Sequence, residues 1–277
     1  MAHLVDEGLH EVAAGATSDD DTLPGLGGEL NAAFPGLELP DRLKRLRSRI
    51  GGRIVFTTSF GLEDQALTHL LAQSGIDVEY ATLDTGRLFP ETYALWAQTE
   101  ARYDIRIRAF YPDHKEIEAL VRAQGINGLY RSMDARKACC EVRKIRPLER
   151  ALRGTAAWIT GLRADQSTAR QDVAFVAYDA TRGLLKANPL ADWTRERVIA
   201  LAENAKVPCN PLHAQGFLSI GCAPCTRAVL PGEPERSGRW WWETESAKEC
   251  GLHVSPDGHL VRAKSSNDAD LPGSRES

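Results

Sequence analysis

The first 40 residues of this chain contain no lysine, no arginine and no long apolar run. A secretory signal peptide needs a basic start followed by an apolar core, so we expect no export. The rest of the chain also lacks anything near the roughly 18 consecutive apolar residues of a membrane span. We therefore expect a soluble cytoplasmic protein with no membrane partner, in a reducing compartment where stable disulfides are rare.

The missing basic residues also divide the chain by charge. Residues 1–40 hold eight acidic side chains, including the run Ser18-Asp-Asp-Asp21, and several glycines. Such a segment is typical of a flexible leader. The remaining residues carry a net charge of +4, with 34 basic against 30 acidic side chains. A nucleic-acid-binding protein would present a strongly basic surface, so we expect no nucleic-acid partner.

Cysteine is scarce as well, but four of the six cysteines form two close pairs. Cys139 and Cys140 are adjacent, and Cys222 and Cys225 are separated by two residues. Four thiolates are the usual ligands of an iron–sulfur cluster and of structural zinc. Zinc normally takes each pair from a Cys-x2–4-Cys turn, whereas adjacent side chains on a helix diverge by about 100°. The spacing favours a 4Fe–4S cluster over zinc, and ordinary buried cysteines are the remaining alternative.

The other two cysteines have different surroundings. Cys209, within Val-Pro-Cys-Asn-Pro, is interpreted as structural. Cys250 lies in Lys-Glu-Cys-Gly-Leu-His253 and is the thiol left over for chemistry. On a helix, His253 would share a face with Cys250 and could orient or activate its thiol, because only the thiolate is a strong nucleophile. The alternative for His253 is a packing or surface role.

Apolar patterns along the chain indicate alternating strands and helices. Short apolar runs predict strands at 53–58, 78–83, 105–110, 156–162 and 173–178. Helical spacing predicts helices over 62–73, 114–124, 139–152 (bent at Pro147) and 195–206, and another that opens at Pro90. This alternation predicts an α/β fold with a mostly parallel, twisted sheet flanked by helices, followed by a loop-rich segment after Gly216. Ligands of such sheets bind beyond the carboxyl ends of the strands.

Three of the expected strands end in loops rich in glycine, hydroxyl groups and arginine. The first carries Ser59-Phe-Gly61-Leu-Glu-Asp64, the second Leu83-Asp-Thr-Gly-Arg, and the fourth Gly161-Leu-Arg163. A hydroxyl-rich turn before a helix presents backbone N–H groups to an anion, although Ser59 could also be an ordinary helix cap. The loops match neither a Walker A motif nor Gly-x-Gly-x-x-Gly. Together they favour a nucleotide pocket.

Taken together, these motifs resemble those of the bacterial assimilatory adenylylsulfate (adenosine 5′-phosphosulfate) reductases, within the phosphoadenylylsulfate reductase family. The resemblance spans roughly residues 50–253. It also includes Asn188-Pro-Leu-Ala-Asp-Trp193, Asn210-Pro-Leu-His213, Gly221-Cys-Ala-Pro-Cys-Thr-Arg227, Arg236-Ser-Gly-Arg-Trp-Trp-Trp242 and Glu249-Cys-Gly-Leu-His253. The cysteine pairs and the last of these motifs are the most specific part.

The resemblance implies an ATP-pyrophosphatase-like fold (adenine nucleotide alpha hydrolase-like) and the reduction of adenosine 5′-phosphosulfate to sulfite and AMP, in sulfate assimilation and cysteine biosynthesis. The implied cofactor is one 4Fe–4S cluster held by Cys139, Cys140, Cys222 and Cys225. Cys250 would be the nucleophile, and a separate thioredoxin the reductant. The implied domains are the leader 1–40, a nucleotide- and cluster-binding domain over 41–230, and a segment over 231–277 that carries the nucleophile and frays after about residue 254.

Substrate contacts follow from the same resemblance and from the loops. Candidates for the phosphate and sulfate are Lys144, Arg236 and Arg239, because arginine suits bidentate contact with oxyanions. The remaining candidates are Ser59, Gly61 and Arg163 in the loops, and Leu83 and Gly161, whose backbone groups would meet the adenine. The tryptophans at 240–242 are interpreted as packing the C-terminal segment rather than stacking on a base. We expect the cluster to act structurally and electrostatically.

Three other functions remain possible at this point. One is a reductase that acts on the 3′-phosphorylated nucleotide, or on both nucleotides; that branch typically lacks the cluster cysteines. Another is an ATP-pyrophosphatase that thiolates tRNA, which the mild charge of the body disfavours. The third is an iron–sulfur sensor that binds nucleotide, which leaves Cys250 without a purpose. A homo-oligomer is compatible with the sequence.

Overall fold

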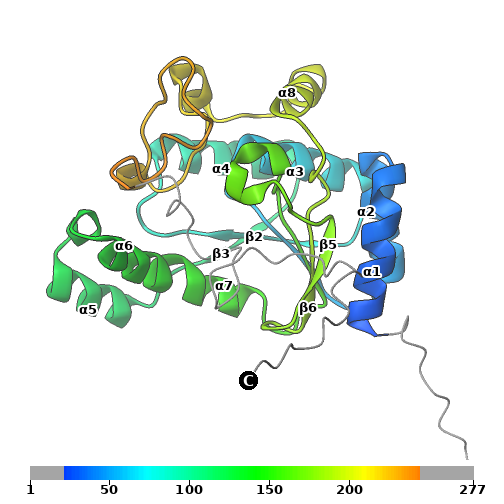
Figure 1. Ribbon diagram of the computed structural model, residues 1–277, viewed down its shortest axis with the longest axis horizontal. Helices are drawn as coiled ribbons and strands as arrows, with labels where there is room; N and C mark the ends of the chain where they lie inside the picture. Colours follow the sequence, from blue (N-terminus) through cyan, green and yellow to red (C-terminus); the bar gives the residue numbers. More distant parts are fainter. Residues whose placement is uncertain (1–21, 244–277) are drawn as a thin grey trace, which may run out of the picture.

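The computed structural model describes residues 22–243, and a six-stranded sheet forms its centre (Figure 1). The strands are β1 (Ile54–Thr57), β2 (Glu79–Leu83), β3 (Ile107–Phe110), β4 (Ala157–Ile159), β5 (Val176–Asp179) and β6 (Leu184–Ala187). They lie in the order β3-β2-β1-β4-β6-β5, and every neighbouring pair is parallel except β5 and β6. The predicted α/β fold with a mostly parallel sheet is confirmed.

Strand β6 was not predicted, because it is only four residues long and contains a lysine. The structure leaves Lys186 only 2% exposed and places its ammonium 5.2 Å from the ring centroid of Trp158. The face of an aromatic ring attracts a cation, which helps to accommodate this buried charge. Gly183, with φ of 66°, lies in the turn that leads from β5 into β6. The resulting antiparallel pair makes β5 an edge strand of the sheet.

Helices cover both faces of the sheet (Figure 1). They are α1 (Leu23–Ala33), α2 (Leu39–Arg49), α3 (Leu62–Ser74), α4 (Pro90–Tyr103), α5 (His114–Gln124), α6 (Met133–Cys140), α7 (Arg146–Ala151) and α8 (Arg195–Asn204). The larger apolar core joins one face of the sheet to α2, α3 and α8, through residues such as Leu43, Leu67 and Val198. A smaller core packs α7 against the other face, through Leu148, Val55 and Trp158.

The predicted helix over 139–152 is divided into three segments. Helix α6 begins earlier than predicted and ends at Cys140, residues Glu141–Ile145 form a π-helical turn, and α7 carries Pro147 in its first turn. Proline is tolerated there because the first turn has no partner for its missing N–H group. A π turn holds one more residue than an α turn, and such turns are frequent at functional sites. This one carries Lys144.

The prediction of a flexible leader over residues 1–40 was wrong for residues 22–40. Helix α1 and the start of α2 lie in this range, and α1 packs against β5. Leu30 and Phe34 are completely buried in the larger core. The error arose because charge and glycine content were given more weight than the apolar residues of the segment. Residues 1–21 lie outside the described part of the chain, as do residues 244–277.

No helix within residues 22–243 is long and apolar enough to cross a membrane.

We expect Leu30→Ala to lower the free energy of unfolding by about 2–5 kcal/mol, because it leaves a cavity in the core beneath α1. The matched control is Leu230→Ala, since Leu230 is 67% exposed and its loss should change stability by about 0.5 kcal/mol or less. Denaturant unfolding of both variants measures the difference. Equal, small effects would show that residues 22–33 do not belong to the folded domain.

Candidate active site

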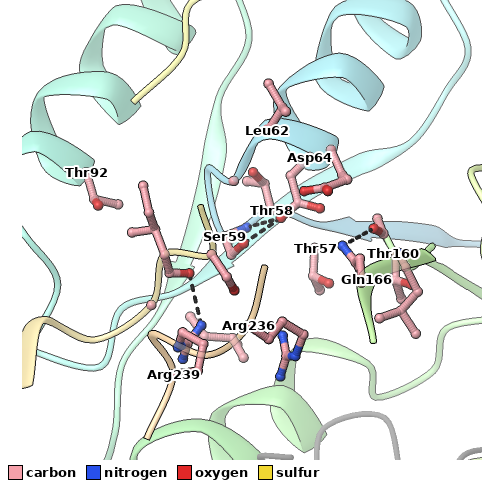
Figure 2. A pocket seen from close by; sticks show the side chains of 18 of the residues that line it. Thr57, Thr58, Ser59, Leu62, Asp64, Thr92, Thr160, Gln166, Arg236 and Arg239 are labelled. Carbon is pink, nitrogen blue, oxygen red and sulfur yellow. Dashed lines mark hydrogen bonds between the residues drawn. The ribbon is translucent and has the colours of Figure 1, made fainter. Parts of the chain in front are cut away.

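A cavity of about 1230 Å³, counted to include its open mouth, lies beyond the carboxyl ends of β1, β2 and β4. Figure 2 looks into it. Seven of the eight residues predicted to contact the substrate line this cavity: Ser59, Gly61, Leu83, Lys144, Gly161, Arg236 and Arg239. Parallel sheets bind ligands at this edge, because the loops after several strands meet there. We call this space the strand-end cavity.

The loop between β1 and α3 is held by a buried carboxylate. Asp64 accepts hydrogen bonds from the backbone N–H of Ser59 (2.6 Å) and from its hydroxyl (2.7 Å; Figure 2). Phe60 takes a left-handed conformation with φ of 59°, and its buried ring stacks on Trp96. Ser59 is therefore not the cap of α3. The cap position belongs to Gly61, which provides no side chain, so the positive end of α3 lies open beside the cavity.

Gly161 allows the loop after β4 to approach this turn. A Cβ atom at position 161 would lie 2.4 Å from Oδ1 of Asp64 and 3.0 Å from Cβ of Glu63. These distances are shorter than real contacts, so any side chain would push the loop away from α3. The glycine of the predicted Gly-Leu-Arg motif is thus required by a close approach.

On the opposite wall, Arg236 and Arg239 point into the cavity (Figure 2). Arg239 is only 6% exposed and donates a hydrogen bond from Nη1 to the carbonyl oxygen of Ile220 (3.2 Å). A Cβ atom at Gly221 would lie 2.2 Å from its Nη2, so this glycine makes room for the guanidinium group. Within residues 22–243, Nε of Arg239 is buried without a hydrogen-bond partner. An anionic ligand could supply the missing acceptor.

Sequence reasoning missed two further residues that line the strand-end cavity. Arg170 is 5% exposed and donates to Oε1 of Gln166 (2.6 Å). It follows the Gly-Leu-Arg loop by a few residues, which was the only available signal. His213 lies with Nδ1 2.8 Å from the carbonyl oxygen of Phe217, and burial lowers its pKa. A neutral ring that donates from Nδ1 leaves Nε2 as an acceptor.

The eighth predicted residue, Arg163, does not line the cavity. Its guanidinium is completely buried and donates to Glu63 (2.9 Å), Asp165 (3.0 Å) and Glu235 (2.7 Å). Three carboxylates therefore occupy the donors that were expected to contact substrate. We no longer assign Arg163 a substrate contact and return to these ion pairs below.

A second, smaller cavity of about 310 Å³ brings together the four paired cysteines. Cys139, Cys140, Cys222 and Cys225 line it, although the two pairs are about 80 residues apart in the sequence. The other residues that line it are Arg87, Leu129, Arg136, Arg143, Lys144 and Pro224. We call this space the cysteine cavity.

The thiols of the cysteine cavity have defined surroundings. Oγ1 of Thr85 lies 3.2 Å from Sγ of Cys222. Burial raises the pKa of the Cys225 thiol to about 11, and burial also raises the pKa of Cys139. Among residues 22–243, no group of three or more His, Cys, Asp or Glu side chains is arranged to hold one metal ion. The thiols surround a common space at a spacing that does not suit a single ion.

Lys144 lines both cavities. It belongs to the π-helical turn that begins directly after Cys140, so the same turn connects a cysteine pair with the strand-end cavity. The position agrees with the expectation that Lys144 faces both regions.

The tryptophan run packs against the body of the protein. Trp240 is 2% exposed and belongs to an apolar cluster with Leu129, Cys222 and Cys225. Trp242 contacts Tyr130 edge to face, with ring centroids 4.5 Å apart. The interpretation of these residues as packing elements is confirmed for Trp240. Cys250 and His253, the predicted catalytic pair, lie outside the described residues, as does Glu249.

Burial raises the pKa of Asp64 from 3.8 to about 6, although its hydrogen bonds from Ser59 oppose this shift. A carboxyl group with a raised pKa in the folded state favours folding when protonated, and this contribution is lost as the pH rises from about 4 to 6. We therefore expect Asp64→Asn, which stays neutral, to become more stable relative to the natural protein over that range. The gain should reach about 3 kcal/mol.

Denaturant unfolding of both proteins at pH 4 and pH 7 measures this change. A difference between the two proteins that does not vary with pH would contradict the raised pKa of Asp64.

Comparison with known proteins identifies the family. The phosphoadenosine phosphosulfate reductase domain matches residues 53–228. A protein of Rhizobium meliloti (strain 1021) named adenosine 5′-phosphosulfate reductase is 51% identical over 239 residues, which cover 86% of this chain and 90% of that protein. A protein of Allochromatium vinosum with the same name is 50% identical over 200 residues, which cover 72% of this chain and 78% of the relative.

A solved structure shares the fold. The phosphoadenylyl-sulfate reductase of Candida auris, crystallised with phosphate, superposes with a TM-score of 0.63 at 24% identity and covers 77% of this chain and 98% of its own. At that identity the likeness concerns the fold alone. The match of the domain, and the relatives at about 50% identity, establish that this chain belongs to the phosphoadenosine phosphosulfate reductase domain family.

Proposed function

We propose that this chain reduces adenosine 5′-phosphosulfate to sulfite and AMP, in sulfate assimilation for cysteine biosynthesis. The observation that carries the proposal is Lys144, a cation that lines both the strand-end cavity and the cysteine cavity. A site for a nucleotide anion and a site of four thiols therefore adjoin. The names of the relatives from Rhizobium meliloti and Allochromatium vinosum support the same substrate.

The nucleotide would lie across the ends of the strands. In our proposal the backbone groups of Leu83 and Gly161 meet the adenine. The phosphate faces the first turn of α3, beside Ser59 and Gly61, where backbone N–H groups and the helix dipole favour an anion.

Cations on the other walls would hold the rest of the anion. Arg236, Arg239, Arg170 and Lys144 all line the strand-end cavity. Charge-assisted hydrogen bonds from arginine to phosphate or sulfate oxygens are short and directional. This arrangement would orient the sulfate group for attack and stabilise the charge on the departing AMP.

The proposed chemistry begins with Cys250. Its thiolate attacks the sulfur of the sulfate group, an S–S bond forms, and the S–O bond to AMP breaks. The enzyme then carries a cysteine S-sulfonate, and AMP leaves with the electron pair of the broken bond. His253 is proposed to orient or activate the thiol. Cations near the site would favour the thiolate, because positive charge lowers the pKa of a thiol.

A separate thioredoxin is proposed to complete the reaction. One of its thiolates attacks the sulfur of Cys250, forms a mixed disulfide and expels sulfite. Its second thiol then breaks the mixed disulfide, which restores Cys250 and leaves oxidised thioredoxin. The two electrons that reduce the substrate come from thioredoxin, so the balance closes without any other reductant. This reaction suits the reducing cytoplasm that the sequence analysis predicted.

The four cysteines fit a 4Fe–4S cluster better than zinc. They line one space, but no three of the metal-binding side chains within residues 22–243 converge on a single ion, and a cluster offers a separate iron to each thiolate. Cys139, Cys140, Cys222 and Cys225 would hold it. When bound, the cluster would contribute a fixed local charge beside Lys144 rather than electrons.

We expect mass spectrometry of the enzyme mixed with adenosine 5′-phosphosulfate, without thioredoxin, to detect one sulfonate group on Cys250. The Cys250→Ser variant should form no adduct, and Cys209→Ser should form it normally. The adduct should form faster with adenosine 5′-phosphosulfate than with its 3′-phosphorylated form, because the four cysteines mark the branch that uses the former. A binding protein that only senses nucleotide would form no adduct, and a faster reaction of the 3′-phosphorylated form would favour the alternative substrate.

We expect Cys225→Ser to lose most of the bound iron, because it removes one of the four proposed ligands. Cys209→Ser is the matched control, since Cys209 lies outside the cysteine cavity and should leave the iron content unchanged. Iron analysis and visible absorption of proteins purified without oxygen measure the result. A folded, active natural protein that contains no iron would rule out the cluster.

A further inference from the structure

Arg163 joins three parts of the chain inside the protein. It lies in the loop after β4 and is completely buried. Its Nε lies 2.9 Å and its Nη2 2.8 Å from Oε1 of Glu63, and Nη2 lies 2.7 Å from Oε2 of Glu235. The partners are 172 residues apart in the sequence. Arginine stays charged at any ordinary pH, so this buried group needs carboxylate partners, and its planar fork reaches both.

Each carboxylate belongs to a wall of the strand-end cavity. Glu63 is the second residue of α3, next to Asp64, which holds Ser59. Its position is thus fixed to the helix end that is proposed to receive the phosphate. The contact of Glu63 with Arg163 therefore starts at the anion-binding wall.

Glu235 belongs to the opposite wall and directly precedes Arg236 in the sequence. Its segment is tightly turned: the N–H of Ser237 donates to the carbonyl oxygen of Pro234, and the N–H of Arg239 donates to that of Arg236. In such a turn, the place of Glu235 largely determines where the two arginines lie. Arg195, at the start of α8, supports Glu235 with Nη1 3.4 Å from its Oε1.

The charges themselves oppose a direct role of Glu235 in binding an anion. A carboxylate on the wall of a cavity that receives phosphate repels the ligand, so its benefit must come from elsewhere. Removing one partner of a buried ion pair is costly, which makes the pair an effective constraint on geometry.

We infer that Arg163, Glu63 and Glu235 form a clasp that positions Arg236 and Arg239 against the anion-binding end of α3. These three are positioning residues, and the inference rests on the proposed binding of an adenine nucleotide. The clasp therefore controls the affinity for the phosphate of the ligand, while the adenosine part is bound by other groups.

The test compares binding of AMP and of adenosine, by calorimetry, to the full chain with its native metal content. We expect Glu235→Gln, which removes the charge at nearly constant shape, to weaken AMP binding about tenfold. Adenosine binding should change less than about twofold, because adenosine carries no phosphate. The matched control is Glu233→Gln in the same loop, since Glu233 pairs with Arg227 and does not line the cavity. It should bind both ligands as the natural protein does.

Arg163→Lys provides a second variant, since lysine keeps the charge but cannot reach two carboxylates as a fork. It should also weaken AMP selectively. The double variant with Glu235→Gln should be no weaker than the poorer single variant, because both remove the same constraint. Additive losses would contradict a shared clasp.

Other outcomes separate the inference from the function on which it rests. Tighter AMP binding by Glu235→Gln would mean that Glu235 acts only by repulsion, and equal losses for AMP and adenosine would mean general damage to the cavity; both overturn the clasp. Unchanged AMP binding by a folded Glu235→Gln variant overturns the clasp alone. Failure of the natural protein to bind AMP overturns the proposed function itself, and the clasp with it.

Discussion

The buried carboxylate of Asp64 is the constraint on which this site depends. It accepts both hydrogen bonds that Ser59 offers and so fixes the turn between β1 and α3, with Phe60 in the left-handed region. Because this turn leaves Gly61 at the cap position, the positive end of α3 lies open beside the cavity instead of being satisfied by a side chain. The same carboxylate occupies the space where a side chain at Gly161 would have to lie. Ionising a buried group is costly, as the raised pKa of Asp64 reflects, and the hydrogen bonds from Ser59 reduce that cost.

The two cavities share their walls, and this explains how they can act together. Ile220 accepts a hydrogen bond from Arg239, Gly221 leaves space for its guanidinium, and Cys222 follows directly as a wall of the cysteine cavity. Thr85 contacts Cys222 and is two residues from Leu83, which lines the other cavity. Any displacement of Cys222 would therefore be transmitted through covalent neighbours to the arginine that is proposed to hold the substrate. Direct electron transfer is not needed for the four thiols to influence the reaction.

Much of the fold was predictable because its signals are local. Apolar periodicity located five strands, and the short motifs at their ends located seven of the residues that line the strand-end cavity. The features that sequence reasoning missed depend on distant contacts. Strand β6 holds a lysine that only the ring of Trp158 makes acceptable in the core. Helix α1 looked like part of an acidic leader until Leu30 was found buried beneath it. Residues beyond Glu243 lie outside the described chain, so Cys250 still rests on the resemblance of its motif.

Arg163 shows most clearly why such a limit exists. A sequence displays the donors of a loop but not the acceptors that reach them from elsewhere in the chain. An arginine in a loop that binds anions was therefore expected to contact an anion, and it does, but the anions are the protein's own carboxylates. One of these, Glu63, occupies a position that the motif Ser-x-Gly-x-x-Asp leaves unspecified, and the other, Glu235, adjoins a proposed substrate ligand. If the clasp is correct, affinity for the substrate depends on residues that never touch it, and such residues become recognisable only when both walls of the cavity are seen together.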